Sequence, residues 1–171
     1  NTSADKFLDK MSEENKKFWN FERKEKAKQA GFTESEIVTL ASIVDEETDN
    51  EAEMPKIAGM YINRLHLNMP LQADPTVKFA TKNFTAHRIY QKWLTIDNPY
   101  NTYKYRGLPP GPIRIPSVAA IDAVLNYVHH DYIYMCAKED FSGTHNFAKT
   151  YEEHQKNAAK YAKALNEHGI N

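Results

Sequence analysis

The distribution of proline constrains this sequence more than any other feature. Seven of the eight prolines fall between residues 70 and 116, together with Gly107 and Gly111. Proline fixes φ and lacks a backbone N–H, so neither a long helix nor a central strand can cross this stretch. We therefore expect ordered loops that contain short helices near residues 75–80 and 87–94, and long loops of this kind usually carry function.

Helical periodicity dominates the part of the chain before these loops. Residues 4–30 have the pattern of one or two amphipathic helices that end at Gly31. Thr33 and Glu36 then form a capping-box pattern, which predicts a helix down to the acidic cluster at residues 45–47. A further helix is expected over about 51–67, with an apolar stripe made of Ile57, Ala58, Tyr61, Ile62 and Leu65.

The part of the chain after the loops combines helix and strand patterns. Ser117 is expected to cap a helix that runs to about residue 127. Residues 132–137 and 144–148 predict two short strands around a turn at Gly143, and a final helix should fill roughly 150–168. The fold class predicted from these patterns is α+β: mostly helical, with a small β-sheet and Pro-rich loops that form a cleft.

Length and composition limit the kinds of protein that this chain can be. A chain of 171 residues can close one hydrophobic core, so we expect a single domain with a helical lead-in over about 1–31 and a core over about 33–168. The formal net charge of −1 arises from 22 basic and 23 acidic residues spread along the chain, which argues against nucleic-acid binding. The single cysteine, Cys136, excludes an intrachain disulfide.

The sequence has no apolar run of the length that a membrane helix needs, and residues 1–7 do not resemble a signal peptide. We therefore expect this stretch itself to be soluble. A start this abrupt, with Thr2 or Ser3 able to cap a helix at once, also suggests that the chain was cut from a longer protein that carries an anchor or targeting segment.

The acidic cluster at the end of the predicted helix is the first candidate for chemistry. ASIVDEET, at residues 41–48, gathers three acids where the helix macrodipole disfavours negative charge. Glu47 follows Val44 by three positions and borders the apolar stripe, whereas Glu46 points nearly opposite. Partial burial would raise the pKa of Glu47, as a general acid requires. The alternative is a solvated helix end, and periodicity alone does not decide between the two.

Other polar residues allow both functional and structural interpretations. Asp74, directly before Pro75, suits a helix cap or an Asx turn as well as a ligand contact. YNTY, at residues 100–103, has the aromatic and amide groups of a sugar site, but aromatic loop residues also cover cores. His145 on the last strand faces either a cleft or a structural partner. A polar turn explains residues 129–131 better than a metal site does.

Six motifs, taken in chain order, resemble the YceG-like endolytic murein transglycosylases. They are ASIVDEET, INRL at 62–65, LQADPT at 71–76, PYNTY at 99–103, GLPPGPI at 107–113 and HNF at 145–147. The resemblance covers roughly residues 35–165. The family's catalytic glutamate directly precedes a threonine, which corresponds here to Glu47 before Thr48. The family commonly has E-K-E-T where this chain has DEET, and often H-T-F where Asn146 stands.

The resemblance implies a substrate, a reaction and a setting. Family members cleave the bond between N-acetylmuramic acid and N-acetylglucosamine without water, leaving a 1,6-anhydromuramoyl end, and no metal or cofactor is expected. It also implies a missing amino-terminal part with one inner-membrane helix and a LysM-like module, a catalytic domain in the periplasm, and peptidoglycan synthases as partners. We expect the glycan to be bound by Gln72, Asp74, Thr76, Tyr100, Asn101, Tyr103 and His145.

Two other functions remain open from the sequence. A water-using glycosidase would pair Glu47 with a second carboxylate, for which Asp74 is the candidate, and would leave reducing sugar ends. A glycan-binding module would keep the aromatic groove without performing chemistry, so its binding would survive replacement of Glu47.

Overall fold

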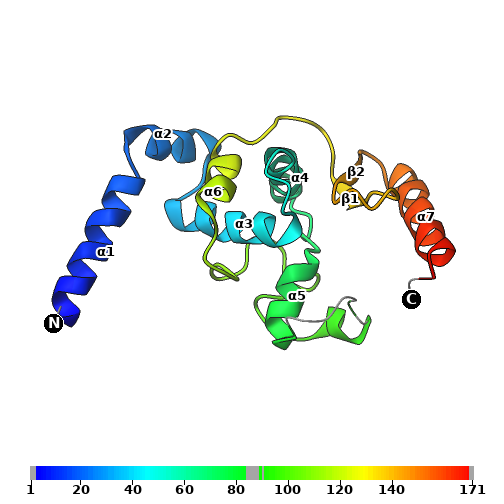
Figure 1. The fold of residues 1–171 in the computed structure, drawn as a ribbon, viewed down its shortest axis with the longest axis horizontal. Helices are drawn as coiled ribbons and strands as arrows, with labels where there is room; N and C mark the ends of the chain where they lie inside the picture. Colours follow the sequence, from blue (N-terminus) through cyan, green and yellow to red (C-terminus); the bar gives the residue numbers. More distant parts are fainter. Residues whose placement is uncertain (1–2, 84–88, 90, 170–171) are drawn as a thin grey trace.

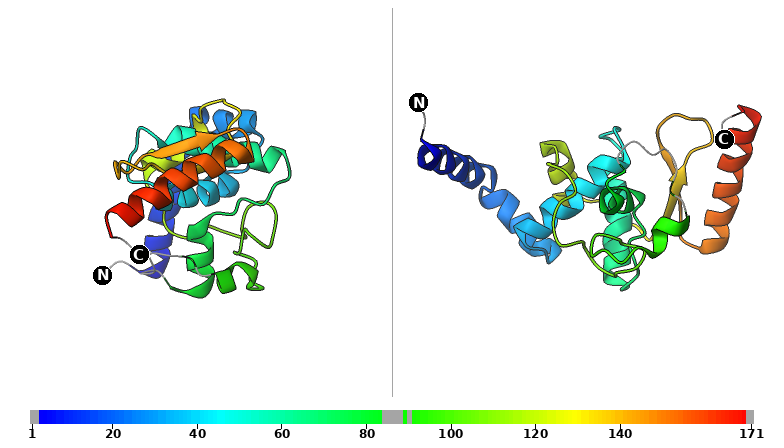
Figure 2. Two further views of the ribbon diagram at one scale, coloured as in Figure 1. Left: turned by 90° about the vertical axis from the view of Figure 1, so that its right-hand side faces the viewer. Right: turned by 90° about the horizontal axis from the view of Figure 1, so that it is seen from below.

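The computed structural model of the protein describes residues 3–83, 89 and 91–169. The molecule is elongated, with α1 at one end and a small sheet and α7 at the other (Figure 1, Figure 2). In chain order the elements are α1 (Ala4–Phe18), α2 (Phe21–Ala30), α3 (Glu34–Glu47), α4 (Met54–His66), α5 (Asp74–Thr81), the 3-10 helix η1 (Gln91–Thr95), α6 (Val118–Leu125), β1 (Tyr134–Ala137), β2 (His145–Ala148) and α7 (Tyr151–Glu167).

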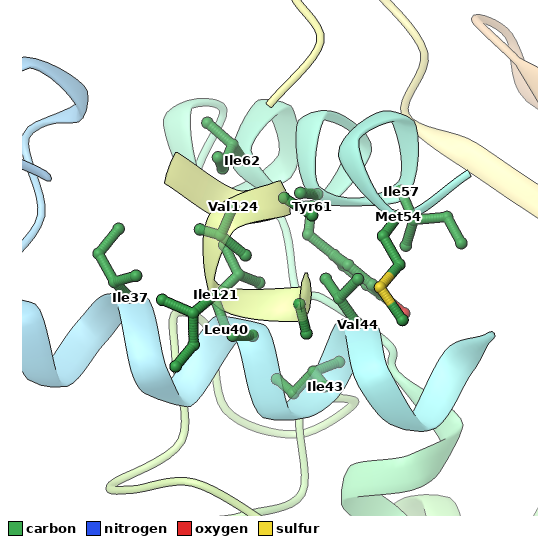
Figure 3. Close-up of a cluster of buried hydrophobic side chains, with 14 of the residues drawn as sticks. Ile37, Leu40, Ile43, Val44, Met54, Ile57, Tyr61, Ile62, Ile121 and Val124 are labelled. Carbon is green, nitrogen blue, oxygen red and sulfur yellow. The ribbon is translucent and has the colours of Figure 1, made fainter. Parts of the chain in front are cut away.

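The hydrophobic core lies where α3, α4 and α6 pack together (Figure 3). Apolar side chains spaced three or four residues apart on each helix meet in this cluster, and removing them from water is the main force that joins the helices. The buried side chains at its centre are Ile37, Leu40, Ile43 and Val44 of α3, Ile57, Tyr61 and Ile62 of α4, and Ile121 and Val124 of α6.

Local signals in the sequence fix both ends of α3. Gly31 ends α2 in the left-handed region at φ 82°, which a residue without Cβ adopts freely. The predicted capping box is present: Thr33 N donates to Glu36 Oε1 at 3.0 Å, and Glu36 N donates to Thr33 Oγ1 at 3.1 Å. At the other end Thr48 is extended, so Glu47 is the last helical residue.

The two strands form an antiparallel hairpin on which α7 packs. Tyr134 pairs with Ala148 and Ala137 pairs with His145. The predicted turn at Gly143 is present, with φ at 83°. This sheet and α7 form a layer beside the helical core (Figure 1).

Polar side chains of α4 hold this layer to the core. Asn63 Nδ2 donates to the carbonyl oxygens of His130 at 2.7 Å and of Tyr132 at 2.9 Å. The buried Arg64 donates from Nε to the Ile133 carbonyl at 2.6 Å and from Nη1 to the Pro70 carbonyl at 2.7 Å. The segment before β1 is therefore bound to α4 through its backbone.

The structure confirms the predicted α+β class and changes several boundaries. The first stretch is two helices because Asn20 caps a new one, accepting from Arg23 N at 2.9 Å. The helix predicted from residue 51 begins at Met54, since residues 51–53 form a turn. Of the helix predicted over 87–94, residues 87, 88 and 90 lie outside the described residues, and the described part contains η1. Among the described residues, no helix has the length and apolarity needed to span a membrane.

Candidate active site

A cleft of about 500 Å³ separates the helical core from the layer of strands and α7. Its core side is lined by residues of α3, α4 and α5 and by the segments next to α5, and its other side by residues of β1, β2 and α7. The polar and aromatic residues that line it are Glu47, Tyr61, Arg64, Gln72, Asp74, Tyr103, Tyr134, His145, Tyr151, His154 and Tyr161.

Glu47 meets the cleft at the C-terminal end of α3. Its Oε1 accepts a hydrogen bond from the Tyr61 hydroxyl at 2.5 Å. Tyr61 is only 2% exposed, and its ring extends from α4 toward the last turn of α3 (Figure 3). Burial raises the pKa of Glu47 to about 7, and the charge of Asp74 adds to the rise, whereas the Tyr61 hydrogen bond, His145 and Lys78 oppose it. A carboxyl group with this pKa exchanges protons readily near neutral pH.

The three acids at the end of α3 have separate environments. Glu46 is exposed and pairs with Arg114 at 3.1 Å. Asp45 accepts a hydrogen bond from Ser117 N at 2.8 Å through Oδ2. A solvated helix end therefore describes Glu46. Glu47 lines the cleft, and its position follows from the helical period, which predicted that it borders the apolar stripe.

Asp74 and Tyr103 form a second polar pair in the cleft. The Tyr103 hydroxyl donates to Asp74 Oδ1 at 2.6 Å. Burial, followed by the charge of Asp74, raises the pKa of Tyr103, so its hydroxyl keeps its proton. Asp74 is the first residue of α5, and the cap position belongs to Ala73, so the capping interpretation of Asp74 is wrong.

Gln72 reaches the cleft from a left-handed backbone conformation. Its φ is 50°, and its backbone N–H donates to the Thr102 carbonyl at 3.2 Å. A residue with a side chain adopts this conformation at some cost, which the surrounding structure must offset. The exposed Gln72 side chain lines the cleft beside Asp74.

Thr76 and Asn101 are fully buried, and neither lines the cleft. The Thr76 hydroxyl donates to the Ala73 carbonyl at 2.7 Å and lies 2.8 Å from Thr102 Oγ1. Asn101 Nδ2 donates to the carbonyl oxygens of Leu94 at 3.0 Å and Ile96 at 2.9 Å. These side chains organise the loop that carries Tyr103. Tyr100 packs against Phe79, with ring centroids 4.7 Å apart, and is also outside the cleft lining.

His145 is the first residue of β2 and lines the cleft. Its Nδ1 is 2.8 Å from Glu53 Oε2, and its backbone N–H donates to Glu53 Oε1 at 2.7 Å. His130 has a structural role, since its Nε2 lies 2.8 Å from the Lys56 carbonyl. Among the residues that the structure describes, no group of His, Cys, Asp and Glu has the arrangement of a metal site.

Sequence reasoning missed several residues of the site. Tyr61 was assigned only to the apolar stripe, although a buried tyrosine hydroxyl normally needs a partner, which is a usable signal. Arg64 and Glu53 gave no comparable signal, because their partners in the opposite layer, Ile133 and His145, lie 69 and 92 residues away in the sequence. The aromatic residues of β1 and α7 face the cleft through tertiary packing alone.

Comparison with known proteins identifies relatives of this chain. The family model of the YceG-like family matches residues 1–160. A Bacillus subtilis (strain 168) protein named endolytic murein transglycosylase is 43% identical over 131 residues, covering 77% of this chain and 36% of the relative. A protein of that name from Streptococcus pneumoniae serotype 2 is 33% identical over 138 residues, covering 78% of this chain and 25% of the relative.

A solved structure shares the fold. The crystal structure of a YceG-like protein from Listeria monocytogenes superimposes with a TM-score of 0.72 at 35% identity, covering 78% of this chain and 43% of that one. The chain thus spans about a quarter to less than half of the length of these relatives. On the family match over residues 1–160, the chain belongs to the YceG-like family.

Proposed function

We propose that this protein is an endolytic peptidoglycan lytic transglycosylase that cleaves MurNAc–GlcNAc bonds within glycan strands and uses Glu47 as acid and base. The observation that carries the proposal is the carboxyl group of Glu47, which lies in an open cleft with a pKa of about 7 and a tyrosine hydroxyl at 2.5 Å. The names of the relatives from Bacillus subtilis and Streptococcus pneumoniae support the same reaction.

One carboxyl group suffices for this reaction. Protonated Glu47 gives its proton to the glycosidic oxygen as the bond from that oxygen to C1 of N-acetylmuramic acid breaks. The C6 hydroxyl oxygen of the same sugar then bonds to C1, and its proton passes to the Glu47 carboxylate. The products are a 1,6-anhydromuramoyl end and a free hydroxyl on the other sugar. Because an intramolecular hydroxyl can have an effective molarity of about 10⁵ M or more, no activated water is needed.

We assign the other polar groups of the cleft to glycan binding. The exposed Gln72 amide and the Asp74 carboxylate, with Tyr103 as its donor, can hydrogen-bond sugar hydroxyls and acetamido groups. His145 completes this set from the opposite wall. Thr76, Tyr100 and Asn101 would support binding indirectly, by fixing the segments that carry these groups.

We also propose a cellular setting on the strength of the family resemblance. In the whole protein, one inner-membrane helix and a LysM-like module would precede this catalytic domain, which would face the periplasm. Residues 1–31 would be the lead-in to the domain, and peptidoglycan synthases would supply the nascent strands that it trims.

The test is to incubate the wild-type protein and Glu47→Gln with uncrosslinked glycan strands and to identify new chain ends by mass spectrometry. Anhydro ends from the wild type, with at least a ~10³-fold loss in Glu47→Gln, are expected, because the amide cannot exchange the proton. Glu46→Gln is the matched control, since Glu46 is exposed on the same helical turn. Equal cleavage by wild type and Glu47→Gln would exclude Glu47 from the mechanism.

A hydrolase is the second candidate, because Asp74 lines the same cleft as Glu47. In that mechanism Asp74 would activate a water molecule or act as the nucleophile, and the new ends would be reducing sugars. Reducing ends from the wild type, together with loss of cleavage in Asp74→Asn, would replace the transglycosylase proposal with this one.

A further inference from the structure

Both carboxylate oxygens of Glu53 bind the same histidine. Oε1 accepts the backbone N–H of His145 at 2.7 Å, and Oε2 lies 2.8 Å from the ring Nδ1. The side chains of Glu53 and His145 are only 11% and 12% exposed. Glu53 directly precedes α4, where a side chain could cap the helix, yet it makes no capping hydrogen bond. Its carboxylate instead binds His145, which lies 92 residues later in the sequence.

When the imidazole of His145 is neutral, this contact fixes which ring nitrogen carries the proton. An ionised carboxylate only accepts hydrogen bonds, so Nδ1 must be the donor in the 2.8 Å contact. In the neutral imidazole the other nitrogen, Nε2, then has a free lone pair and acts as an acceptor. In the neutral imidazole, Glu53 therefore makes Nε2 an acceptor.

Nε2 is the ring nitrogen of His145 that Glu53 leaves available. His145 lines the cleft and Glu53 does not, and Nδ1 is already directed at Glu53. Among the described residues, the only hydrogen bond of the His145 ring is the one through Nδ1. Glu47 lines the same cleft and interacts electrostatically with His145. Nε2 is therefore the ring nitrogen left to bind a ligand in the cleft where the proposed reaction takes place.

We propose that Glu53 is a positioning residue that holds His145 in its Nδ1–H tautomer, so that Nε2 accepts a hydrogen bond from a sugar hydroxyl beside Glu47. This inference rests on the proposed function for the identity of the ligand, a glycan. An acceptor at this point orients a hydroxyl hydrogen and favours the geometry in which the sugar reacts. His145 touches the substrate, and Glu53 acts through His145.

A purely structural role, in which Glu53 only ties β2 to the core, makes different predictions. The layer is already held by Asn63 and Arg64, which bind the backbone carbonyls before β1. This structural role would require the hydrogen bond from the His145 backbone N–H to Glu53 but no particular tautomer of the His145 ring. The two roles are therefore separated by the state of the imidazole, not by stability alone.

Glu53→Gln is the sharpest variant, because it keeps the shape of the side chain and removes one acceptor. If the amide oxygen retains the His145 backbone N–H, the amide nitrogen faces Nδ1 and must donate to it. The imidazole then adopts the Nε2–H tautomer, and the nitrogen that faces the cleft changes from acceptor to donor. Glu51→Gln is the matched control, since Glu51 is an exposed glutamate two residues earlier.

The test combines ¹⁵N NMR of the His145 ring with the kinetics of glycan cleavage. In the spectra we expect the Nδ1–H tautomer in the wild type and Glu51→Gln, and the Nε2–H tautomer in Glu53→Gln. In the kinetics we expect kcat of Glu53→Gln to fall about 10–100-fold, with little change in KM. The double variant Glu53→Gln/His145→Ala should be no slower than His145→Ala, because Glu53 acts only through the imidazole.

Two results would overturn the proposal. One is an unchanged Nδ1–H tautomer in Glu53→Gln. The other is a loss of activity in Glu53→Gln that accompanies a lower melting temperature and adds to the loss from His145→Ala in the double variant. If the wild type cleaves no glycan, the proposed function fails separately. The same spectra recorded with glycan strands added to Glu47→Gln then decide this proposal, since an unshifted Nε2 resonance would reject it.

Discussion

At the scale of single residues, the properties of Glu47 come from where α3 ends. The helix places this carboxyl group three residues after the buried Val44, so it borders the core, while Glu46 turns to the surface and pairs with Arg114. Tyr61 brings a hydroxyl to Glu47 from the next helix. Neighbouring acids with nearly the same sequence context therefore have different chemistry, because one turns toward the core and the other toward water.

The raised pKa of Glu47 predicts how stability depends on pH. The folded protein binds this proton more tightly than the unfolded chain does, with a pKa of about 7 against an ordinary value of 4.5. The free energy of unfolding should therefore fall as pH rises from about 4.5 through about 7, by up to on the order of 3 kcal/mol from this group. Denaturant unfolding of wild type and Glu47→Gln at pH 5 and 8 measures this, and the variant should lose that pH dependence.

Tyr61→Phe should shift the pH dependence of activity. The Tyr61 hydrogen bond favours the charged carboxylate and lowers the pKa of Glu47, so removing the hydroxyl raises that pKa further. In the proposed mechanism the protonated acid is the active form, so the alkaline limb of the pH–rate profile should move to higher pH, by on the order of one unit. Tyr105→Phe is the control, since the Tyr105 hydroxyl binds Asp97 outside the cleft lining. An unmoved alkaline limb would contradict the role of Tyr61.

The sequence predicted part of this site for a physical reason. The helical period alone places Glu47 at the edge of the apolar stripe, because the geometry of an α-helix is fixed. Tyr61 and Glu53 act on partners 14 and 92 residues away. No periodic pattern encodes such contacts, which arise only when helices and strands meet in the folded protein.

At the scale of elements, α4 connects the parts of the site. One side of it packs in the core through Ile57 and Ile62, while Asn63 and Arg64 bind the segment that leads into β1. Gly59 lets that segment approach: a Cβ at this position would lie 2.2 Å from the Val128 carbonyl oxygen. The absence of a side chain is therefore a packing requirement at this position.

Gly59→Ala should destabilise the protein although alanine favours helices. The gain in helix propensity is about 1 kcal/mol. The added Cβ, however, would clash with the Val128 carbonyl oxygen, which belongs to the backbone and cannot move aside. Overpacking of this kind typically costs about 1–3 kcal/mol. We expect a lower melting temperature by calorimetry. Gly111→Ala is the control, because its Cβ would meet only the Tyr100 hydroxyl, at 3.4 Å, and it should change the melting temperature little. If Gly111→Ala lowered the melting temperature as much as Gly59→Ala, the clash at Gly59 would not be the cause.

Element boundaries were predictable where local chemistry sets them. Thr33 and Gly31 marked the start of α3, and Gly143 marked the turn of the hairpin, because caps and tight turns depend on neighbouring residues. The start of α4 was predicted three residues early. Glu51 and Glu53 look like ordinary first-turn residues, but Glu53 is held by a distant histidine.

At the scale of the whole molecule, the cleft exists because two layers face each other. The core contributes Glu47 and the polar groups around α5, and the layer of strands and α7 contributes His145 and an aromatic wall. The sequence predicted the helices and strands of both layers but not the layers or their arrangement, since side chains such as Arg64 specify how the elements dock.

Arg64→Leu should loosen the docking of the two layers. Loss of the guanidinium leaves the Ile133 and Pro70 carbonyl oxygens without their donor, at a cost of about 1–3 kcal/mol each. Hydrogen exchange should accelerate over residues 132–148 more than over α3, and glycan cleavage should fall at least ~10-fold as the cleft walls separate. Arg106→Leu, on the surface, is the control. Uniform acceleration in all elements would indicate general destabilisation instead.

The order of the two layers along the chain has a consequence for biosynthesis. Glu47 and its hydrogen-bond donor Tyr61 are only 14 residues apart, whereas the opposite wall is supplied by β1, β2 and α7, from Tyr134 to Glu167. A ribosome therefore releases Glu47 and Tyr61 well before the residues that form the opposite wall of the cleft. We expect the growing polypeptide to contain the Glu47–Tyr61 pair early but to form the complete cleft only after α7 has emerged.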